Sequence, residues 1–170
     1  PPRSTLFPYT TLFRSDAAAF TLRSGAKPGD LLYVTGEIGN SLASGHHLDF
    51  EPRLAEGRFL AENGFASAML DISDGLLLDA ERLAKASRLR LCIDPAAVPL
   101  RAGAERESAL SDGEDYELLF TVPPGREEEL KQVWKVTKLT RIGVVEPGEP
   151  DVCDCSGRSL LRNGKCGYEH

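Results

Sequence analysis

The sequence predicts an α/β (α+β) fold in which a mixed β-sheet is covered by helices. Short apolar runs bounded by glycine and proline are typical of strands, and segments with apolar residues at helical spacing lie between them. The two kinds of segment do not alternate strictly, so the sheet is expected to be mixed rather than all parallel. The chain has 170 residues, 41% hydrophobic and 27% charged, which suits one globular domain with its own core.

The first half of the chain is expected to contain three extended segments and two helices. Proline and glycine provide the turn before the first full strand. Pro52 suits the start of a helix, and Asn63-Gly64 suits its end. The expected elements are extended residues 19–22, a strand at 31–35, a helix from 52 to a stop at 63–64, a strand at 68–72 and a helix from 75 onward.

The second half repeats this mixture of strands and helices. Three glutamates, Glu127–Glu129, begin one helix and complement its dipole, and Leu130, Val133 and Trp134 are predicted to form its buried stripe. The expected elements are a strand at 89–93, a short helix near 104–110, a strand at 116–122, the helix from 127, a strand at 140–145 and a small C-terminal hairpin.

A polar cluster lies where the strand at 68–72 becomes the next helix. It comprises Asp71, Ser73 and Asp74. Backbone N–H groups at a helix start favour anions such as phosphate, and two aspartates offer hard oxygen ligands to a Mg²⁺ ion that also binds phosphate. The same residues also fit a helix N-cap that binds no ligand. Asp79 lies within the helix and is not counted as a ligand.

Charge and hydropathy narrow the classes of partner. The chain has 20 basic and 26 acidic residues, a net charge of −6, which disfavours general binding to nucleic acid or to an anionic membrane surface. No apolar stretch approaches the roughly 20 residues that span a bilayer, and no signal segment opens the chain. We therefore expect a cytoplasmic protein with no nucleic-acid or membrane partner.

The four cysteines allow two interpretations. Cys153, Cys155 and Cys166 lie close together in sequence but lack the paired spacing that structural zinc sites favour. A zinc site and a set of reduced thiols in the terminal hairpin both remain open, and the thiols are favoured. Cys92 alternates with apolar neighbours and is expected to pack in a strand.

The first fifteen residues, PPRSTLFPYTTLFRS, contain a near-repeat of Thr-Leu-Phe bracketed by Arg-Ser. This pattern resembles translated sequencing-adapter sequence. We therefore treat residues 1–15 as a non-native segment and residues 16–170 as the domain.

Several motifs occur in an order that indicates a family. They are LRSGAKPGD (22–30), YVTG (33–36), DISDG (71–75), GEDYELLF (113–120) and GYEH (167–170). Together they resemble the C-terminal half of the thiamine-monophosphate kinase family, within the aminoimidazole ribonucleotide synthetase superfamily. DISDG alone indicates only the superfamily, whereas GEDYELLF and GYEH are more particular to the kinase. The resemblance covers about residues 16–170 and implies an aminoimidazole ribonucleotide synthetase-like C-terminal domain.

The resemblance implies Mg²⁺-dependent phosphoryl transfer from ATP to thiamine monophosphate, which yields thiamine diphosphate. Such chemistry depends on positioning and on neutralising phosphate charge. By motif position, Asp71 and Asp74 are similar to magnesium ligands, and Ser73 and Arg23 to ATP contacts. A solvated surface arginine is the alternative for Arg23. No residue is assigned a catalytic role.

For the acceptor, the resemblance implies binding by Glu114 and by Tyr168, whose ring is placed near the thiamine rings. A turn acid is the alternative for Glu114. Asp115 and Glu117 are expected either to cap or to point to solvent. Asp112 stands where the family usually has a second glycine and adds a carboxylate beside the substrate loop.

The family's N-terminal domain, with further aspartate ligands and much of the ATP site, is not in this chain. The resemblance therefore implies a fragment that is inactive alone and a homodimer when full length. One alternative is a sister enzyme of the superfamily, of the selenophosphate synthetase or hydrogenase-maturation type. Another is a non-catalytic ligand-binding domain.

Overall fold

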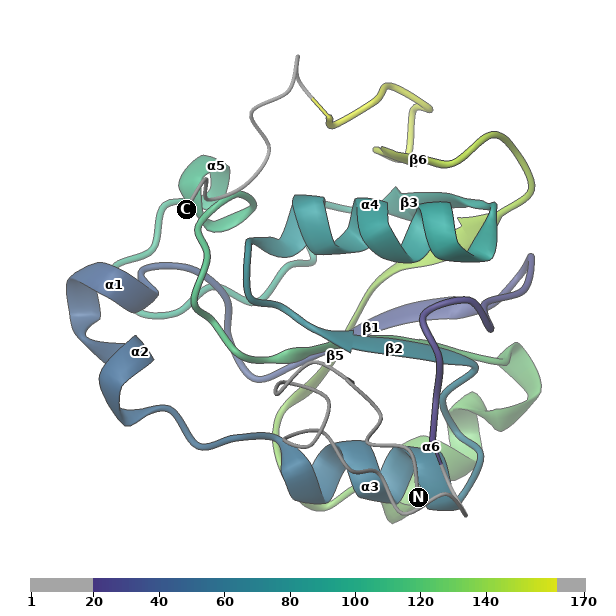
Figure 1. Ribbon diagram of the computed structural model, residues 1–170, viewed down its shortest axis with the longest axis horizontal. Coiled ribbons are helices and arrows are strands. Elements are labelled where there is room, and N and C mark those ends of the chain that lie inside the picture. The colour runs from purple at the N-terminus through teal and green to yellow at the C-terminus, as the bar shows by residue number, and fades with distance from the viewer. Residues whose placement is uncertain (1–19, 162–170) are drawn as a thin grey trace, which may run out of the picture.

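The computed structural model describes residues 20–161. Six strands form one mixed sheet in the order β2-β4-β1-β5-β3-β6, seen edge-on in Figure 1. The strands are β1 (Leu31–Thr35), β2 (Ala68–Asp71), β3 (Arg90–Ile93), β4 (Leu118–Val122), β5 (Leu139–Glu146) and β6 (Asp151–Cys153).

The strand directions bring the polar motifs to one edge of the sheet. Both β1 and β2 are antiparallel to β4, with Val34 opposite Leu119 and Asp71 opposite Leu118. Because β1 and β2 are both antiparallel to β4, they run in the same direction. Their carboxyl ends, and the segments that follow them, therefore meet beside the start of β4.

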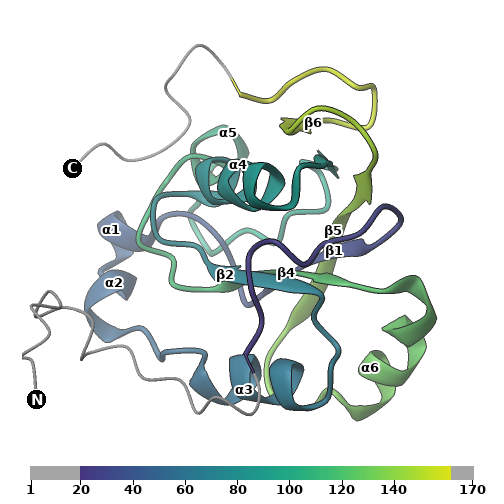
Figure 2. The ribbon, with the colours of Figure 1, turned by 45° about the vertical axis from the view of Figure 1, so that its right-hand side comes forward.

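Helices cover both faces of the sheet (Figure 2). On one face α4 packs over the larger core, and on the other α3 and α6 enclose a smaller core around Phe120 and Leu60. The one-turn helices α1, α2 and α5 lie on the side of the molecule where β2 ends (Figure 1). The helices are α1 (Ser41–Ser44), α2 (His46–Asp49), α3 (Leu54–Glu62), α4 (Leu76–Ser87), α5 (Arg106–Ala109) and α6 (Glu127–Val133), with a 3-10 turn η2 (Pro124–Arg126) before α6.

The predicted fold class, a mixed sheet covered by helices, is confirmed. One strand begins later than predicted, because Tyr116 has φ 53°, which takes the chain out of the extended conformation until Leu118. The stripe on α6 is also narrower than predicted. Leu130 and Trp134 are buried, but the side chain of Val133 is 45% exposed. Val133 is the last residue of α6, and its side chain faces away from the smaller core. None of the helices within residues 20–161 has the length and apolarity needed to cross a membrane.

Candidate functional site

The DISDG and GEDYELLF segments, which are about forty residues apart in sequence, are joined side by side at the end of the sheet. Pairing between β2 and β4 continues past both strand ends. Ile72 N–H donates to the Glu117 carbonyl at 2.7 Å, Tyr116 N–H to the Ile72 carbonyl at 2.8 Å, and Glu114 N–H to the Ser73 carbonyl at 2.8 Å. These three bonds fix Ser73 and Glu114 relative to each other.

Asp79 shapes the strand-to-helix turn from inside α4. Its side chain is 1% exposed, and Oδ2 accepts hydrogen bonds from the backbone N–H groups of Ser73 and Asp74, both at 2.9 Å. Arg82 donates to Asp79 Oδ1 at 2.6 Å and also pairs with the Asp74 carboxylate. Burial raises the pKa of Asp79, against the lowering effect of these hydrogen bonds. The turn is therefore held by a buried carboxylate that sequence reasoning had left out of the site.

That turn requires glycine at position 75. Gly75 has φ 112°, which L side chains rarely adopt, and an added Cβ would lie 2.6 Å from the Ser111 carbonyl oxygen. The backbone of the turn thus lies against the segment that leads into the GEDYELLF loop. This close approach explains why a small residue separates Asp74 from the helix.

Glu114 is oriented by an aromatic pair. The Tyr116 hydroxyl donates to Glu114 Oε2 at 2.6 Å, and the Tyr116 ring stacks on Phe50, which follows α2, with centroids 4.2 Å apart. Glu114 and Tyr116 have φ of 66° and 53°, so the loop is held in a left-handed conformation that residues other than glycine seldom adopt. The hydrogen bond to Glu114 raises the pKa of Tyr116 to about 12, and the charges of Asp71 and Asp74 add to the rise.

The two remaining acids of the loop are buried, so of the two alternatives, capping and pointing to solvent, the second was wrong. Glu117 is 2% exposed; it accepts from Thr35 Oγ1 at 2.6 Å and from both Arg53 Nε and Nη2 at 2.8 Å. A Cβ at Gly36 would lie 2.0 Å from Glu117 Oε1, so a glycine is needed where β1 ends. Glu117 therefore joins the end of β1 and the start of β4 to the start of α3.

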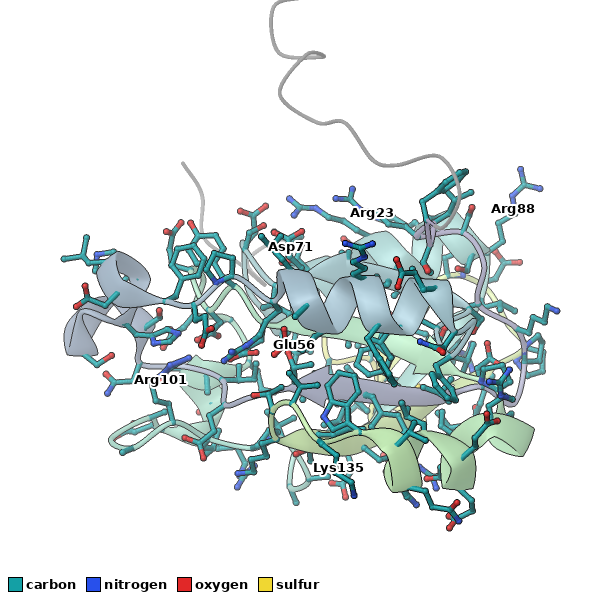
Figure 3. All side chains as sticks on the ribbon, turned by 90° about the horizontal axis from the view of Figure 1, so that it is seen from below. Arg23, Glu56, Asp71, Arg88, Arg101 and Lys135 are labelled. Atoms are coloured by element: carbon teal, nitrogen blue, oxygen red, sulfur yellow. The ribbon has the colours of Figure 1, made fainter. Side chains whose placement is uncertain are left out.

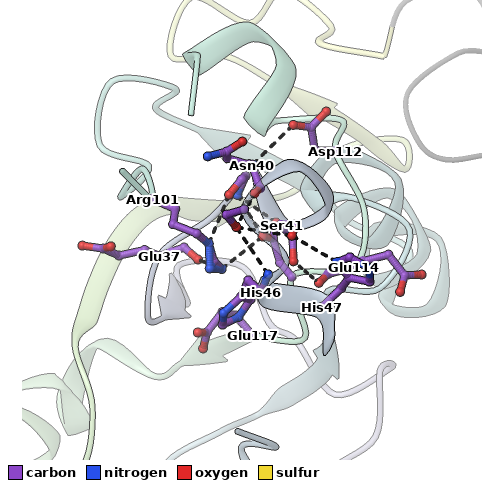
Figure 4. A network of polar contacts seen from close by, with 12 residues as sticks. Glu37, Asn40, Ser41, His46, His47, Arg101, Asp112, Glu114 and Glu117 are labelled. Atoms are coloured by element: carbon purple, nitrogen blue, oxygen red, sulfur yellow. Dashed lines mark hydrogen bonds and ion pairs between the residues drawn. The ribbon is translucent and has the colours of Figure 1, made fainter. Parts of the chain in front are cut away.

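Asp115 holds the segment after β1. Figure 4 shows Glu37, Asn40 and Arg101 in the polar network of this segment. Asp115 is 1% exposed, and its carboxylate accepts from Gly39 N–H at 2.9 and 3.0 Å. Arg101 Nη2 lies 3.3 Å from Asp115 Oδ1 and donates to the Glu37 carbonyl at 2.7 Å. Burial raises the pKa of Asp115 to about 7, against the lowering influence of Gly39 N–H and Arg101.

Asp112, the departure from the family's usual glycine, is directed at the same segment. It accepts a hydrogen bond from Asn40 N–H at 3.5 Å (Figure 4). Ser41 Oγ donates to the Glu114 carbonyl at 2.5 Å, which adds a second link between this segment and the loop. The extra carboxylate is therefore engaged by the segment after β1, which is itself linked to the Glu114 loop.

Asp71 and Asp74 differ in environment. Asp71 is exposed at the end of β2, whereas Asp74 is half-buried beside Arg82. Within residues 20–161 no three His, Cys, Asp or Glu side chains group closely enough to enclose a metal ion. Magnesium, however, is commonly held by one or two carboxylates together with phosphates and water. The donors that this turn presents fit that pattern.

Of the other two predicted site residues, Arg23 is the one that the structure describes. Arg23 is exposed and lies beside β2 and the far end of α4, where Ser87 Oγ donates to its carbonyl at 2.8 Å; Figure 3 labels it together with Asp71. Among the described residues, no hydrogen bond or ion pair joins Arg23 to the DISDG turn. Tyr168 lies outside the described residues, as does Cys166.

The sequence predicted the motifs of this site but not the residues that hold the motifs in place. Asp79, Arg82, Arg53 and Phe50 all position motif residues, yet none lies within a motif. For Asp79 a signal existed, because an acid in the first turn of a helix often binds nearby N–H groups. For Arg53 and Phe50 no local signal existed.

Known proteins are similar to this chain in sequence. Residues 27–155 match the family described as AIR synthase related protein, C-terminal domain. The chain is 37% identical over 134 residues to a thiamine-monophosphate kinase of Rhodopirellula baltica, an alignment that covers 73% of this chain and 42% of that protein. It is 34% identical over 188 residues to the thiamine-monophosphate kinase of Escherichia coli K12, covering 87% and 54%. The chain thus spans about half the length of the curated relatives it matches.

Solved structures of thiamine-monophosphate kinases have a similar fold. The thiamine-monophosphate kinase from Stenotrophomonas maltophilia K279a aligns with a TM-score of 0.71 at 26% identity, covering 82% of this chain and 54% of that one. "AaThiL complexed with AMPPCP and TMP" aligns with a TM-score of 0.68 at 30% identity, covering 88% and 54%. A hydrogenase maturation protein, HypE in complex with ATP, aligns at 0.65 but is 18% identical and shares only the fold. The resemblance inferred from the motifs is confirmed: the chain belongs to the AIR synthase related family, as its C-terminal domain, and its named relatives are thiamine-monophosphate kinases.

Proposed function

We propose that this chain is the C-terminal domain of an enzyme that transfers a phosphoryl group from ATP to thiamine monophosphate to form thiamine diphosphate. The observation that carries the proposal is the hydrogen-bonded junction of the DISDG turn with the Glu114 loop. The junction holds Ser73 and Glu114 next to each other, which supports adjoining sites for the donor phosphates and for the acceptor. A relative with 30% identity is named as a complex with AMPPCP and TMP, which supports an ATP-type donor and a thiamine phosphate acceptor.

In this proposal Asp71 and Asp74 hold Mg²⁺, which supplies neutralisation of phosphate charge when bound. Arg82 and Asp79 keep the Asp74 carboxylate and the Ser73 backbone in place, so that little reorganisation is needed when the donor binds. Ser73 contacts ATP, and Arg23 binds its phosphates from the side of β2.

The acceptor is bound on the other side of the junction. Glu114, fixed by the Tyr116 hydroxyl, accepts hydrogen bonds from the amino group of the thiamine pyrimidine. Tyr168 covers the thiamine rings. A hydrophilic, charged acceptor and a polyphosphate donor are thereby brought together without a covalent intermediate on the protein.

We further propose that residues 16–170 act together with an N-terminal domain of the kinase type and that residues 1–15 are not part of the native enzyme. The lengths of the relatives support the first point, since this chain covers 42% and 54% of them. The complete enzyme is proposed to be a cytoplasmic homodimer, and this domain alone to be inactive.

The test is formation of thiamine diphosphate from thiamine monophosphate and Mg-ATP by the complete reading frame that encodes this domain. Asp74→Asn removes one charge at the turn, and Glu149→Gln is the matched control in the exposed β5–β6 turn. We expect Asp74→Asn to lose at least about a hundredfold in kcat/KM, in line with the loss of one charge-stabilising group, while Glu149→Gln keeps full activity. No product from the unaltered frame would refute the kinase assignment, and an active Asp74→Asn would refute the metal role.

A further inference from the structure

Two cysteines lie against each other at the edge of the sheet farthest from the candidate site. Cys92 in β3 and Cys153 in β6 are register partners in a parallel pair of strands. Neighbouring strands lie about 4.8 Å apart, and Cα atoms of disulfide-bonded cysteines are usually about 4.4–6.8 Å apart. Because aligned residues of parallel strands point to the same face, the two side chains meet. Their Sγ atoms are 2.9 Å apart.

This distance is shorter than ordinary van der Waals contact between two sulfur atoms and longer than the S–S bond of about 2.05 Å. Both residues are free cysteines, Cys92 at 7% and Cys153 at 0% exposure. The backbone is therefore already arranged for a bond between them, and only a small movement of the two side chains is needed.

One of the two cysteines borders a cavity that is open to solvent. Cys92 lines a cavity of about 450 Å³ together with Gly143, Glu146, Asp154 and Cys155. Cys155, two residues beyond Cys153, is exposed. Burial raises the pKa of the Cys92 thiol, and the neighbouring Cys153 and Glu146 add to the rise. The Cys92 thiol is therefore protonated near neutral pH and reacts slowly, but it is not shut off from a small molecule.

We propose that Cys92 and Cys153 are an oxidation site, at which a small disulfide such as oxidised glutathione converts the two thiols to an intramolecular disulfide. The Cys92 thiolate attacks one sulfur of the small disulfide, which forms a mixed disulfide and releases one small thiolate. The Cys153 thiolate then attacks Cys92 Sγ in the mixed disulfide, which forms the Cys92–Cys153 bond and releases the second small thiolate. Two electrons pass from the protein to the small disulfide, and the two protons of the cysteine thiols end on the two released thiols.

The bond would fasten the last strand of the sheet. β6 is three residues long, the shortest strand described, and it lies at the edge of the sheet, where β3 is the one named strand that pairs with it. A link between residues 92 and 153 closes a loop of about sixty residues, and long loops gain most from a crosslink in the chain-entropy view. The inference does not depend on the proposed kinase activity.

The test is to equilibrate the full chain in buffers of graded oxidised to reduced glutathione, trap free thiols by alkylation and map the peptides. Cleavage before aspartate separates Cys153 from Cys155, since Asp154 lies between them. We expect loss of two free thiols and recovery of a linked pair that contains Cys92 and Cys153. The variant Cys155→Ser should give the same linked pair, and its thermal midpoint should rise by several degrees on oxidation.

Cys153→Ser, checked for folding by circular dichroism, should show no stabilisation and leave Cys92 open to alkylation. If Cys92 and Cys153 are both alkylated at every glutathione ratio, the proposal is overturned. It is also overturned if Cys153 is found linked to Cys155 or Cys166 in place of Cys92. Both results are read on the unaltered chain, so a variant that misfolds does not decide the outcome.

Discussion

Asp79 is the clearest case of a single side chain on which the candidate site depends. It lies in the first turn of α4 and is almost fully buried, yet both of its oxygens are engaged, one by two backbone N–H groups and one by Arg82. A buried carboxylate is stable only with such partners, and the N–H groups in turn need an acceptor. Removal of the Asp79 carboxylate should therefore destabilise the turn that carries Ser73 and Asp74.

We predict that Asp79→Ala lowers the free energy of unfolding by about 2–4 kcal/mol, because the backbone N–H groups of Ser73 and Asp74 lose their acceptor and Arg82 loses a partner. Urea unfolding measures the change. Glu81→Ala on the same helix removes only the exposed pair with Lys85 and should cost less than about 0.5 kcal/mol. Equal effects of the two variants would show that Asp79 is not a support of the turn.

A second residue-scale prediction concerns Tyr116, which fixes the carboxylate of Glu114. In the complete kinase, Tyr116→Phe should raise KM for thiamine monophosphate about three- to tenfold with little change in kcat, because a net hydrogen bond is worth about 0.5–1.5 kcal/mol. Tyr33→Phe is the matched control, since its hydroxyl donates to Glu127 at 2.6 Å on the opposite face of the sheet. Steady-state kinetics compares the two. An unchanged KM in Tyr116→Phe would contradict the role given to Glu114 or to its partner.

At the scale of elements, the candidate site is formed by the turns that follow β1 and β2 and by the loop that precedes β4. β1 and β2 both stop beside the start of β4, and each stop uses a glycine at a close approach: Gly36 against Glu117 and Gly75 against Ser111. Buried strands place the backbone accurately, whereas the short turns after them carry the polar groups. This division explains why Ser73, Asp74 and Glu114 lie in turns after or before strands, while Asp79 and Arg82 support the DISDG turn from α4.

We predict that Gly75→Ala lowers the free energy of unfolding by about 3 kcal/mol or more, because the φ of 112° and the contact with Ser111 both oppose a side chain. Gly64→Ala tests the backbone effect alone, since Gly64 has φ 63° with no atom within 4 Å of an added Cβ, and should cost about 1–2 kcal/mol. Thermal or urea unfolding gives both values. If Gly75→Ala lowers the free energy of unfolding by no more than Gly64→Ala does, then the contact between residue 75 and Ser111 does not oppose a side chain.

At the scale of the whole molecule, buried acids link the site to global stability. Asp115 joins the segment after β1 to the loop before β4, and in the folded protein its pKa is about 7 against 3.8 in the unfolded chain. Between these values the folded state keeps a proton that the unfolded state has released. Raising the pH through this window therefore lowers the free energy of unfolding.

We predict that stability of the parent chain falls relative to Asp115→Asn as pH rises from about 4 to about 7, and that the difference is constant below and above this window. The amide cannot titrate, so it removes only this contribution. Denaturant unfolding at a series of pH values measures it. A difference that stays level between pH 4 and 7, or that changes in the opposite direction, would show that the proton on Asp115 is not linked to folding.

Much of the fold followed from local patterns. The apolar run at 68–70, the helical spacing after Gly75 and the proline and glycine turns were sufficient to predict a mixed sheet with helices. Errors arose where tertiary contacts override local preference. Tyr116 leaves the strand conformation because its hydroxyl and ring are held by Glu114 and Phe50, and Val133 stays exposed because the core beneath α6 ends at Leu130 and Trp134.

The sequence by itself determined the fold class, the family and the identity of the polar motifs, because each of these is written in contiguous residues. Only the tertiary structure decided what those residues touch. Arg53 and Glu117 are 64 positions apart, and Cys92 and Cys153 are 61 apart, yet sheet register and helix docking place each pair in contact. Local sequence carries no signal for such partners, since their distance depends on how β1, β4 and β6 are ordered within the sheet. Burial of Asp79 and Asp115, and the pKa shifts that follow, depend on that packing in the same way.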